Sequence, residues 1–503
     1  MDYMPKIGLE IHVELKTKSK MFCSCVNDSQ ETEPNKNICP ICLGHPGILP
    51  TINIEAVKLV IKTGLALNCK IANTSKFERK NYFYPDLPKG YQISQYADPL
   101  CKEGFLIIPS NNKKIRIRRI HLEEDTAKLI HPEGENYSLL DFNRAGIPLM
   151  ELVTEPDIES AKEAKEFARE LQLILRYLGV SDADMEKGQM RVEANISLVK
   201  NEKLEIKNSN LEKQNLGTKV EIKNLNSFKA VERAIEYEIR RQSKILEDGG
   251  EVIQETRGWD EKKGITFSQR EKEEAHDYRY FPEPDLPPME FNEDFISDLK
   301  NQLPELPLQK RERFQQEYGL LPTNIEILIS NKDLSEYFEK TISELIAWVK
   351  EKNISKENYQ KLVQITSNYL LSEALGLLGG KPFSEKEFPI TPENFAEFIT
   401  IIYEKNLSSK IAKILLKEMF ETKKDPSDIL EEKELTQIQD QETLRNIIAT
   451  VVANNQKAIE DFKKGKESAL QFLMGQVMKE TKGRADPETT KKLLLDFLNN
   501  DKI

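Results

Sequence analysis

Four cysteines near the N-terminus stand as two close pairs, a pattern that could hold a metal ion. Cys23 and Cys25 form C-x-C, and thirteen residues later Cys39 and Cys42 form C-x-x-C. Each short turn aims two sulfurs at one point, as a tetrahedral thiolate zinc site requires. The first pair is one residue tighter than the usual ligand spacing, and a redox pair or unrelated free thiols are the alternatives. We predict a structural zinc knuckle.

A second candidate site lies in KIGLEIHVEL, where apolar and polar residues alternate. This alternation predicts a strand that carries Glu10, His12 and Glu14 on one face. Carboxylates beside an imidazole can bind a divalent cation. The alternative is the polar outer face of an antiparallel sheet.

Two acidic runs favour the metal interpretation. HLEEDTAK contains His121, Glu123, Glu124 and Asp125, and DFNRAGIPLMELVTEPD contains Asp141, Asn143, Arg144, Glu151 and Glu155. Magnesium binds a few carboxylates and leaves coordination positions for phosphate oxygens. Either run alone is weak evidence, because acidic clusters also occur as solvated turns.

Cations and aromatic residues alternate in FERKNYFYPDLPKGYQISQ, which contains Lys80 and Tyr82. Such a loop suits a nucleotide or a terminal nucleoside, because cations bind phosphate and rings stack on a base. A packed aromatic corner with surface lysines is the alternative. Arg191 and Asn195 share the polar face of the predicted strand RVEANISLV; they are candidates for a phosphate pocket or a plain polar pair.

The elements that position these residues indicate an α+β fold. We expect an N-terminal cradle domain over residues 1–292, with a mixed or antiparallel sheet and the cysteine knuckle. A helix should end at Gly179, after a periodic run of apolar residues. The proline-rich segment PEPDLPP predicts a boundary, followed by a helical domain over 293–408 and a small all-helical tail over 409–503.

Composition limits the class of protein. The 503 residues are 39% hydrophobic and 31% charged, which is typical of a globular protein of about three domains. Neither a secretory signal nor an apolar run long enough for a membrane span is recognisable, and six cysteines are too few for a disulfide scaffold. We expect a cytoplasmic protein without a membrane partner. The net charge of −11 argues against nonspecific nucleic-acid binding, although local basic patches can still contact phosphate.

Motifs typical of P-loop nucleotide binding and of hydrolases are missing from the sequence. Gly379, Gly380 and Lys381 precede Pro382, which has no N–H for a phosphate, so this run is not a P-loop. There is no G-x-S-x-G and no amidase-like Gly/Ser-rich stretch.

Long motifs of the chain resemble the GatB family, which provides the B subunit of the glutamyl/aspartyl-tRNA amidotransferase. They are LEIHVEL, SKMFCSC with CPICLGHPGILP, RKNYFYPDLPKGYQISQ, HLEEDTAK, LDFNRAGIPLMEL, RVEANISL, VEIKNLNSF and AHDYRYFPEPDLPP. The tail resembles the family's helical tail domain through NNQKAIEDFKKGKESALQFLMGQVMK. The four cysteines match those members that carry a zinc knuckle.

The resemblance implies a reaction in two steps. ATP and Mg²⁺ would phosphorylate the side-chain carboxylate of Glu-tRNA(Gln) or Asp-tRNA(Asn), and ammonia would then displace phosphate. A carboxylate is a poor acyl donor to ammonia, and phosphorylation supplies a leaving group. The implied partners are the amidase (A) subunit, which makes ammonia from glutamine, the small (C) subunit, and the misacylated tRNA.

The resemblance also suggests residue roles. His12, Glu124 and Glu151 would bind Mg²⁺, and Glu10 would be a nearby acidic group of the catalytic site. Lys80 and Tyr82 would contact ATP or the terminal adenosine, with Arg191 and Asn195 in the phosphate pocket. The lysines that could touch the tRNA body, or simply form a solvated helix face, are Lys457, Lys463, Lys464 and Lys466.

Two other functions compete with this one. A noncatalytic tRNA-binding adaptor would present the aminoacyl end to another protein, but it has no use for the set His12, Glu124 and Glu151. A free-standing zinc hydrolase is disfavoured, because four cysteines close the coordination sphere and leave no position for water.

Overall fold

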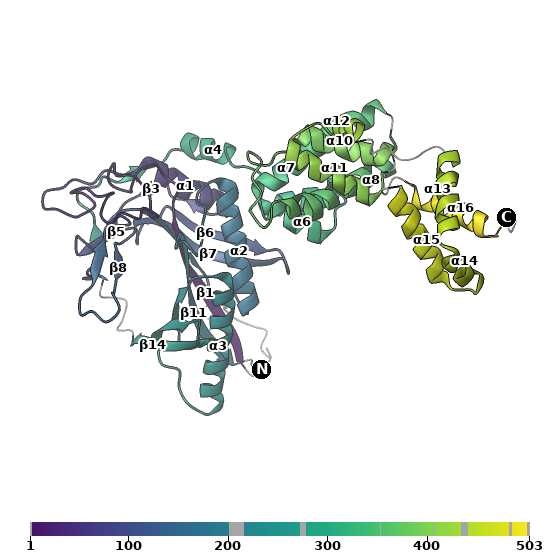
Figure 1. Cartoon of the computed structure of the whole chain (residues 1–503). Coiled ribbons are helices and arrows are strands. Elements are labelled where there is room, and N and C mark those ends of the chain that lie inside the picture. The colour runs from purple at the N-terminus through teal and green to yellow at the C-terminus, as the bar shows by residue number, and fades with distance from the viewer. Residues whose placement is uncertain are drawn as a thin grey trace, which may run out of the picture. The chain divides into compact units, whose positions relative to one another are not determined.

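The computed structural model describes residues 3–200, 216–271, 278–352, 354–405, 407–433, 441–481 and 485–499. It divides into two compact units, Met1–Leu308 and Gln309–Ile503 (Figure 1). The first unit continues past residue 292, because helix α4 (Glu293–Asn301) packs on α1 (Ile54–Ala66) and buries Leu299 in the same core. The second unit contains both of the helical parts that we separated at residue 408. The expected α+β class is confirmed.

A nine-stranded sheet forms the first unit, in the order β14-β13-β12-β11-β1-β10-β7-β6-β2. Its strands are β1 (Tyr3–Glu14), β2 (Lys70–Ile71), β6 (Cys101–Ile108), β7 (Lys113–Glu124), β10 (Pro148–Thr154), β11 (Met190–Lys200), β12 (Val220–Leu225), β13 (Glu255–Asp260) and β14 (Ile265–Glu271). All neighbours are antiparallel except β12 and β13. The central strand β1 pairs with β10 on one side and β11 on the other, so segments far apart in the chain meet at its polar residues.

Helices cover one face of this sheet. In β1, four alternating apolar residues are buried in the core: Ile7, Leu9, Ile11 and Val13. Helices α2 (Ala161–Leu178) and α3 (Phe228–Glu247) lie along this face (Figure 1). The predicted end of α2 is confirmed: Gly179 caps it with φ +68°, in the left-handed region that glycine adopts without strain. The polar residues of β1 therefore lie on the opposite face.

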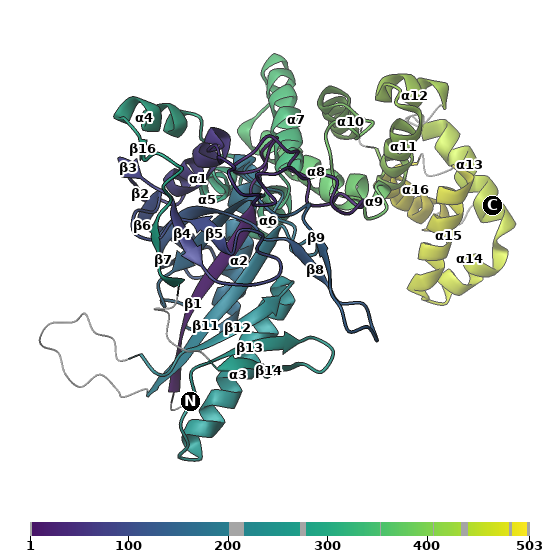
Figure 2. The ribbon, with the colours of Figure 1, turned by 90° about the vertical axis from the view of Figure 1, so that its left-hand side faces the viewer.

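Short sheets and loops flank the polar side of the first unit (Figure 2). They consist of β3 (Thr74–Ser75), β4 (Glu78–Asn81), β5 (Tyr91–Ser94), β8 (Lys128–Ile130), β9 (Leu139–Asp141), β15 (Phe281–Pro282) and β16 (Met289–Glu290). Strand β4 pairs with β5 on one side and β15 on the other. It carries Lys80.

The second unit is helical. Its helices are α5 (Pro307–Tyr318), α6 (Pro322–Ile329), α7 (Lys332–Glu351), α8 (Lys356–Asn368), η2 (Tyr369–Ala374), α9 (Leu375–Leu377), α10 (Pro392–Glu404), α11 (Ser409–Thr422), α12 (Pro426–Glu432), α13 (Gln441–Asn454), α14 (Gln456–Lys463), α15 (Glu467–Glu480) and α16 (Pro487–Asn499). The last four helices share a hydrophobic cluster of their own, which includes Leu444, Ile448 and Leu473. Among the described residues, no helix is both long and apolar enough to cross a membrane.

Candidate functional site

A row of polar residues crosses four neighbouring strands of the large sheet. His12 on β1 pairs with Arg191 on β11 and with Glu151 on β10, and Glu151 pairs with His121 on β7. Paired residues of antiparallel strands point to the same face. The register therefore brings two imidazoles and a carboxylate together from positions 12, 121 and 151.

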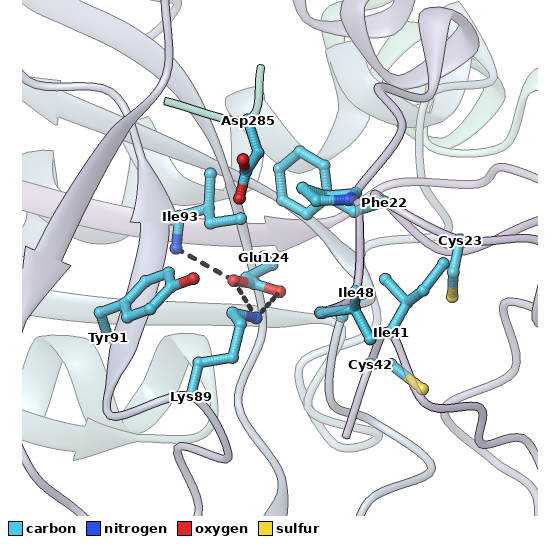
Figure 3. A pocket seen from close by; sticks show the side chains of 12 residues that line it. Phe22, Cys23, Ile41, Cys42, Ile48, Lys89, Tyr91, Ile93, Glu124 and Asp285 are labelled. Carbon is cyan, nitrogen blue, oxygen red and sulfur yellow. Dashed lines mark hydrogen bonds and ion pairs between the residues drawn. The ribbon is translucent and has the colours of Figure 1, made fainter. Parts of the chain in front are cut away.

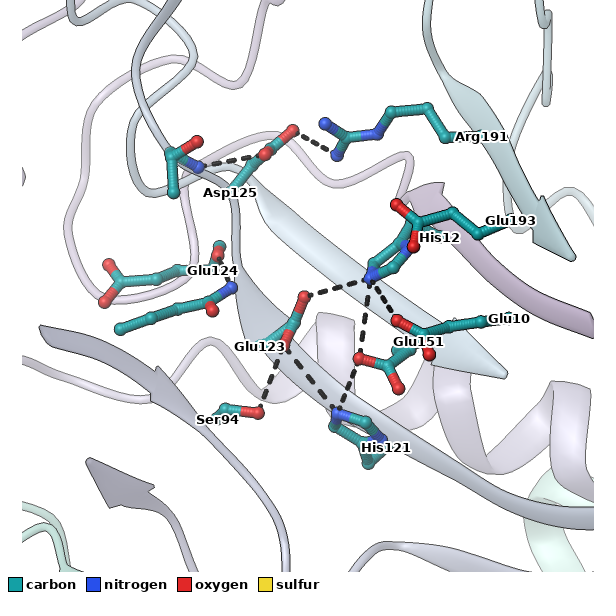
Figure 4. A network of polar contacts seen from close by, with 12 residues as sticks. Glu10, His12, Ser94, His121, Glu123, Glu124, Asp125, Glu151, Arg191 and Glu193 are labelled. Carbon is teal, nitrogen blue, oxygen red and sulfur yellow. Dashed lines mark hydrogen bonds and ion pairs between the residues drawn. The ribbon is translucent and has the colours of Figure 1, made fainter. Parts of the chain in front are cut away.

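The two histidines of this row meet at the carboxylate of Glu151 (Figure 4). Its Oε2 atom lies 3.4 Å from Nε2 of His12 and 3.4 Å from Nε2 of His121. Glu123 bridges the same imidazoles, with Oε1 3.8 Å from His12 and Oε2 3.7 Å from His121. Glu10 completes the cluster, its Oε1 3.8 Å from Nε2 of His12. We call these five residues the carboxylate–histidine cluster.

Two overlapping sets within the cluster have metal-ligand geometry. The ligand atoms of Glu10, His12 and Glu151 lie within 4.8 Å of one another, and so do those of His121, Glu123 and Glu151. The three carboxylates suit a hard cation such as Mg²⁺, whereas imidazole nitrogens are borderline donors that transition metals also accept. The donor set fits a divalent cation.

Charges in the cluster compensate one another strongly. Burial lowers the pKa of His12, but the hydrogen bond and charge of Glu151, with Glu123 and Glu10, outweigh burial and raise the pKa to about 9. Burial favours the neutral form of Glu151, yet the charges of the two histidines hold its pKa well below the usual value. The carboxylates thus favour the protonated form of His12. A metal bound by this histidine would displace the proton, since only neutral imidazole is a ligand.

Glu124 does not lie in the cluster. Its Oε1 atom is 2.6 Å from Nζ of Lys89 and accepts a hydrogen bond from the backbone N–H of Ile93 (Figure 3). The residue lines a small pocket beside the cysteine knuckle. The reason is the alternation of β7: Glu124 shares a face with the core residue Leu122, while Glu123 shares a face with His121.

Lys80 and Tyr82 lie close to the cluster. Burial opposes the charge of Lys80, but the carboxylates of Glu123 and Glu151 outweigh it and raise the pKa of the amine. The amine also lies 5.1 Å from the ring centre of Tyr278 and 6.0 Å from that of Tyr82. A half-buried cation therefore lies between aromatic rings and the carboxylates of the cluster.

Arg191 and Asn195 differ in their availability. Nη2 of Arg191 donates to Oδ2 of Asp125 at 2.7 Å, so this guanidinium already has a carboxylate partner. Asn195 pairs with Gly8 one row beyond Glu10, and its buried Oδ1 accepts no hydrogen bond from the described residues. Asn195 is the better placed of the two for an incoming polar group.

The cysteines converge as a knuckle. The sulfurs of Cys23, Cys25, Cys39 and Cys42 all lie within 4.8 Å of one another. Sγ of Cys39 and Cys42 are 3.9 Å apart, close to the ~3.8 Å edge of a tetrahedron with zinc–sulfur bonds of ~2.3 Å. The backbone N–H of Cys39 donates to Sγ of Cys42 at 3.1 Å, which stabilises a thiolate. The donor set fits a structural metal.

Glu14, on the same strand face as His12, supplies a pH-dependent prediction. Burial, then the charge of Asp125, raises its pKa from 4.5 to about 7. Its contribution to folding is therefore fully present below pH 4.5 and lost as the pH rises through 7. Glu14→Gln should remove this loss, so we expect the variant to be more stable than wild type above pH 7 by roughly 3 kcal/mol. Urea denaturation at pH 5 and pH 8 measures the difference.

The matched control for Glu14→Gln is Glu186→Gln, at an exposed glutamate. It should change the free energy of unfolding little at either pH. An advantage of Glu14→Gln that is the same at pH 5 and pH 8 would contradict the assignment of the titration to Glu14.

Comparison with known proteins places this site in a family. The family model described as "GatB/GatE catalytic domain" matches residues 5–297, which include the whole carboxylate–histidine cluster and the knuckle. This chain belongs to the GatB/GatE family. A second model, described as "GatB domain", matches residues 362–498.

Full-length relatives agree with this membership. Three proteins, each named as the B subunit of an aspartyl/glutamyl-tRNA(Asn/Gln) amidotransferase, are similar over nearly all of both chains. Those of Thermotoga maritima, Caldanaerobacter subterraneus and Persephonella marina are 48%, 49% and 47% identical over 100%, 99% and 99% of this chain, and over 100% of each relative. The predicted membership of the GatB family is confirmed.

The lysines expected on the GatB tail lie around α14 and the start of α15. They are Lys457, Lys463, Lys464 and Lys466, and all four are exposed or partly exposed. Lys466 forms an ion pair of 2.9 Å with Asp461. Their exposure is what a phosphate-binding surface requires, and it is equally what a solvated helix face shows.

Two members of the cluster were given no role from the sequence. His121 and Glu123 stand in HLEE, where Ile120 and Leu122 are the buried alternates. The signal was therefore present as a strand alternation that assigns 121 and 123 to the face away from the core.

Proposed function

We propose that this chain is the carboxylate-activating subunit of a tRNA-dependent amidotransferase. It binds Glu-tRNA(Gln) or Asp-tRNA(Asn), phosphorylates the side-chain carboxylate with ATP, and lets ammonia replace the phosphate. The observation that carries the proposal is the carboxylate–histidine cluster, in which Glu10, Glu123 and Glu151 gather around His12 and His121. The names of the full-length relatives support it.

Residues of the cluster have defined tasks in this reaction. Glu151, with His12 and Glu10 on one side and His121 and Glu123 on the other, would hold Mg²⁺. A bound Mg²⁺ neutralises phosphate charge and orients ATP for in-line transfer. Because Glu124 bonds to Lys89 instead, we replace it by Glu123 in the proposed ligand set.

Groups around the cluster would hold the substrates. The amine of Lys80 sits where it can neutralise a phosphate, and the ring of Tyr82, packed edge-to-face against Tyr278 with centroids 5.9 Å apart, can stack on a base. The buried Oδ1 of Asn195 has no donor among the described residues, so it can accept a hydrogen bond from a hydroxyl or amine of the substrate. These positions share the polar side of the sheet, so the nucleotide and the aminoacyl end can be held together, which removes the entropy cost of their encounter during reaction.

Three further parts complete the proposed enzyme. The cysteine knuckle holds a structural Zn²⁺. The amidase (A) subunit supplies ammonia and the small (C) subunit completes the complex, while Lys457, Lys463, Lys464 and Lys466 contact the tRNA body through its phosphates. Since aminoacyl-tRNA and ATP are consumed, we place the reaction in the cytoplasm.

The test is phosphate release that depends on misacylated tRNA. The chain and its partner subunits are mixed with Glu-tRNA(Gln), ATP and Mg²⁺ but no amide donor. We expect Glu123→Gln to slow the release on the order of 100-fold, because it removes one negative ligand of the metal. Glu124→Gln should stay within about threefold of wild type, since its amide oxygen can still accept from Lys89 and Ile93.

The two variants change neighbouring residues in the same way, from glutamate to glutamine, so each is the control for the other. The reverse order of effects would return Glu124 to the ligand set and remove Glu123. Intact tRNA binding without any tRNA-dependent ATP cleavage in the wild type would favour the noncatalytic adaptor.

A further inference from the structure

An irregularity in strand β7 turns one arginine toward the carboxylate–histidine cluster. Arg119 pairs with Val153 of β10, but the next pair is Ile117 with Thr154, so Arg118 has no counterpart on β10. Before this point Ile115 and Ile117 face the core, and after it Ile120 and Leu122 do. Such a bulge reverses the alternation and re-aims side chains. It places Arg119 on the face of His121 and Glu123.

The guanidinium of Arg119 has weak partners where it lies. Its Nη2 is 3.5 Å from Oε1 of Glu151. Its Cζ lies 5.7 Å from the ring centre of Tyr96, which stacks on Tyr280 at 4.6 Å and 15°. The Nε–H is buried and finds no acceptor in the part of the chain that the structure describes. A buried donor without an acceptor is unfavourable unless a ligand supplies one.

Two other arginines of β7 each have a bidentate carboxylate partner. Arg116 donates two hydrogen bonds to the carboxylate of Asp157, at 2.9 and 2.7 Å. Arg118 does the same with Glu155, at 2.9 and 2.7 Å. Arg119, three-quarters buried beside the cluster, has no comparable bidentate partner among the described residues. Its fork is available to an incoming anion.

We propose that Arg119 binds an oxyanion beside the metal site, either the terminal phosphate of the nucleotide or the side-chain carboxylate of the aminoacyl group. A planar guanidinium matches both with two parallel hydrogen bonds. The stacked rings of Tyr96 and Tyr280 restrict its movement. This inference rests on the proposed function, because it names a contact within that same site.

Arg119→Lys is the informative variant, since it keeps the charge and loses the fork. Arg118→Lys, one residue away but exposed and paired with Glu155, is the matched control. We would titrate the full chain with a nonhydrolysable ATP analogue and with ADP, and follow Mn²⁺ binding by electron paramagnetic resonance. Phosphate release by the assembled complex with misacylated tRNA is the second arm.

Either of two results supports the proposal. A loss of about 10- to 100-fold in affinity for the triphosphate analogue, with ADP and Mn²⁺ binding unchanged, identifies the terminal phosphate as the anion. Unchanged nucleotide binding, with a KM for misacylated tRNA raised about 10- to 100-fold, identifies the substrate carboxylate. Arg118→Lys should match wild type in both arms.

Two results overturn it. If Arg119→Lys behaves as Arg118→Lys does in both arms, the guanidinium binds no anion. If Mn²⁺ binding falls as much as nucleotide binding, Arg119 acts by positioning Glu151. A wild-type complex without tRNA-dependent ATP cleavage would instead refute the proposed function, while the nucleotide titration would still report on Arg119.

Discussion

Glu151→Gln should reduce tRNA-dependent ATP cleavage by about 10³-fold or more, the largest effect that we expect from a single substitution. Glu151 is the one carboxylate common to both metal-ligand sets, and its Oε2 is 3.4 Å from each imidazole. The amide keeps the size of the side chain but loses the charge, so neither set retains a full complement of anionic ligands. Metal affinity and phosphoryl transfer should fail together.

Measurement requires both activity and metal binding. Glu155→Gln is the matched control, because Glu155 comes directly after β10, the strand that carries Glu151, and pairs with the exposed Arg118. It should leave Mn²⁺ affinity and ATP cleavage within about twofold, as expected for an exposed ion pair. Near-normal Mn²⁺ binding in Glu151→Gln would show that the metal lies elsewhere.

Cys42→Ser should release zinc from the knuckle and destabilise the first unit. Cys42 is the buried member of the four, and its Sγ accepts the N–H of Cys39. The hydrogen bond from Cys23 is the main cause that lowers the pKa of Cys42, to about 5, which favours the thiolate that zinc requires. We expect about one zinc per wild-type chain and less than roughly a tenth of that in the variant after dialysis against a chelator.

Elemental analysis and thermal unfolding of the full chain measure both parts of this prediction. Cys69→Ala is the control, because Cys69 is a thiol outside the knuckle. It should retain zinc. A metal-free wild type with the same unfolding temperature as the zinc-bound form would contradict a structural role for the knuckle.

The alternation of β1 was sufficient to predict one side of the site. Glu10 and His12 stand between core residues, and the strand they predicted is the centre of the sheet. Glu151 stood in an acidic run of the sequence, but its role as a metal ligand came from the resemblance, and its place opposite His12 depends on strand register. Register is a long-range property that a local pattern does not contain.

Glu124 shows why the other side was harder to assign. In HLEE two glutamates are adjacent, and only one can share a face with His121. The bulge at Arg118 reverses the alternation of β7. The pattern at the start of the strand assigns even-numbered residues to the polar face, whereas the pattern at its end assigns odd-numbered residues to that face. The position of Arg119 beside the cluster was not predicted either, because a bulge has no reliable signature in one sequence.

The position of β1 between two late strands has a consequence for synthesis. The backbone N–H of Leu9 donates to Oγ1 of Thr154, which is made 145 residues later, and the other partner strand, β11, ends at Lys200. At about 5–20 residues per second, translation leaves β1 without β10 for roughly 7–30 s and without β11 for roughly 10–40 s. An apolar strand is exposed during that interval, so we expect a chaperone to bind the nascent chain before the catalytic domain folds.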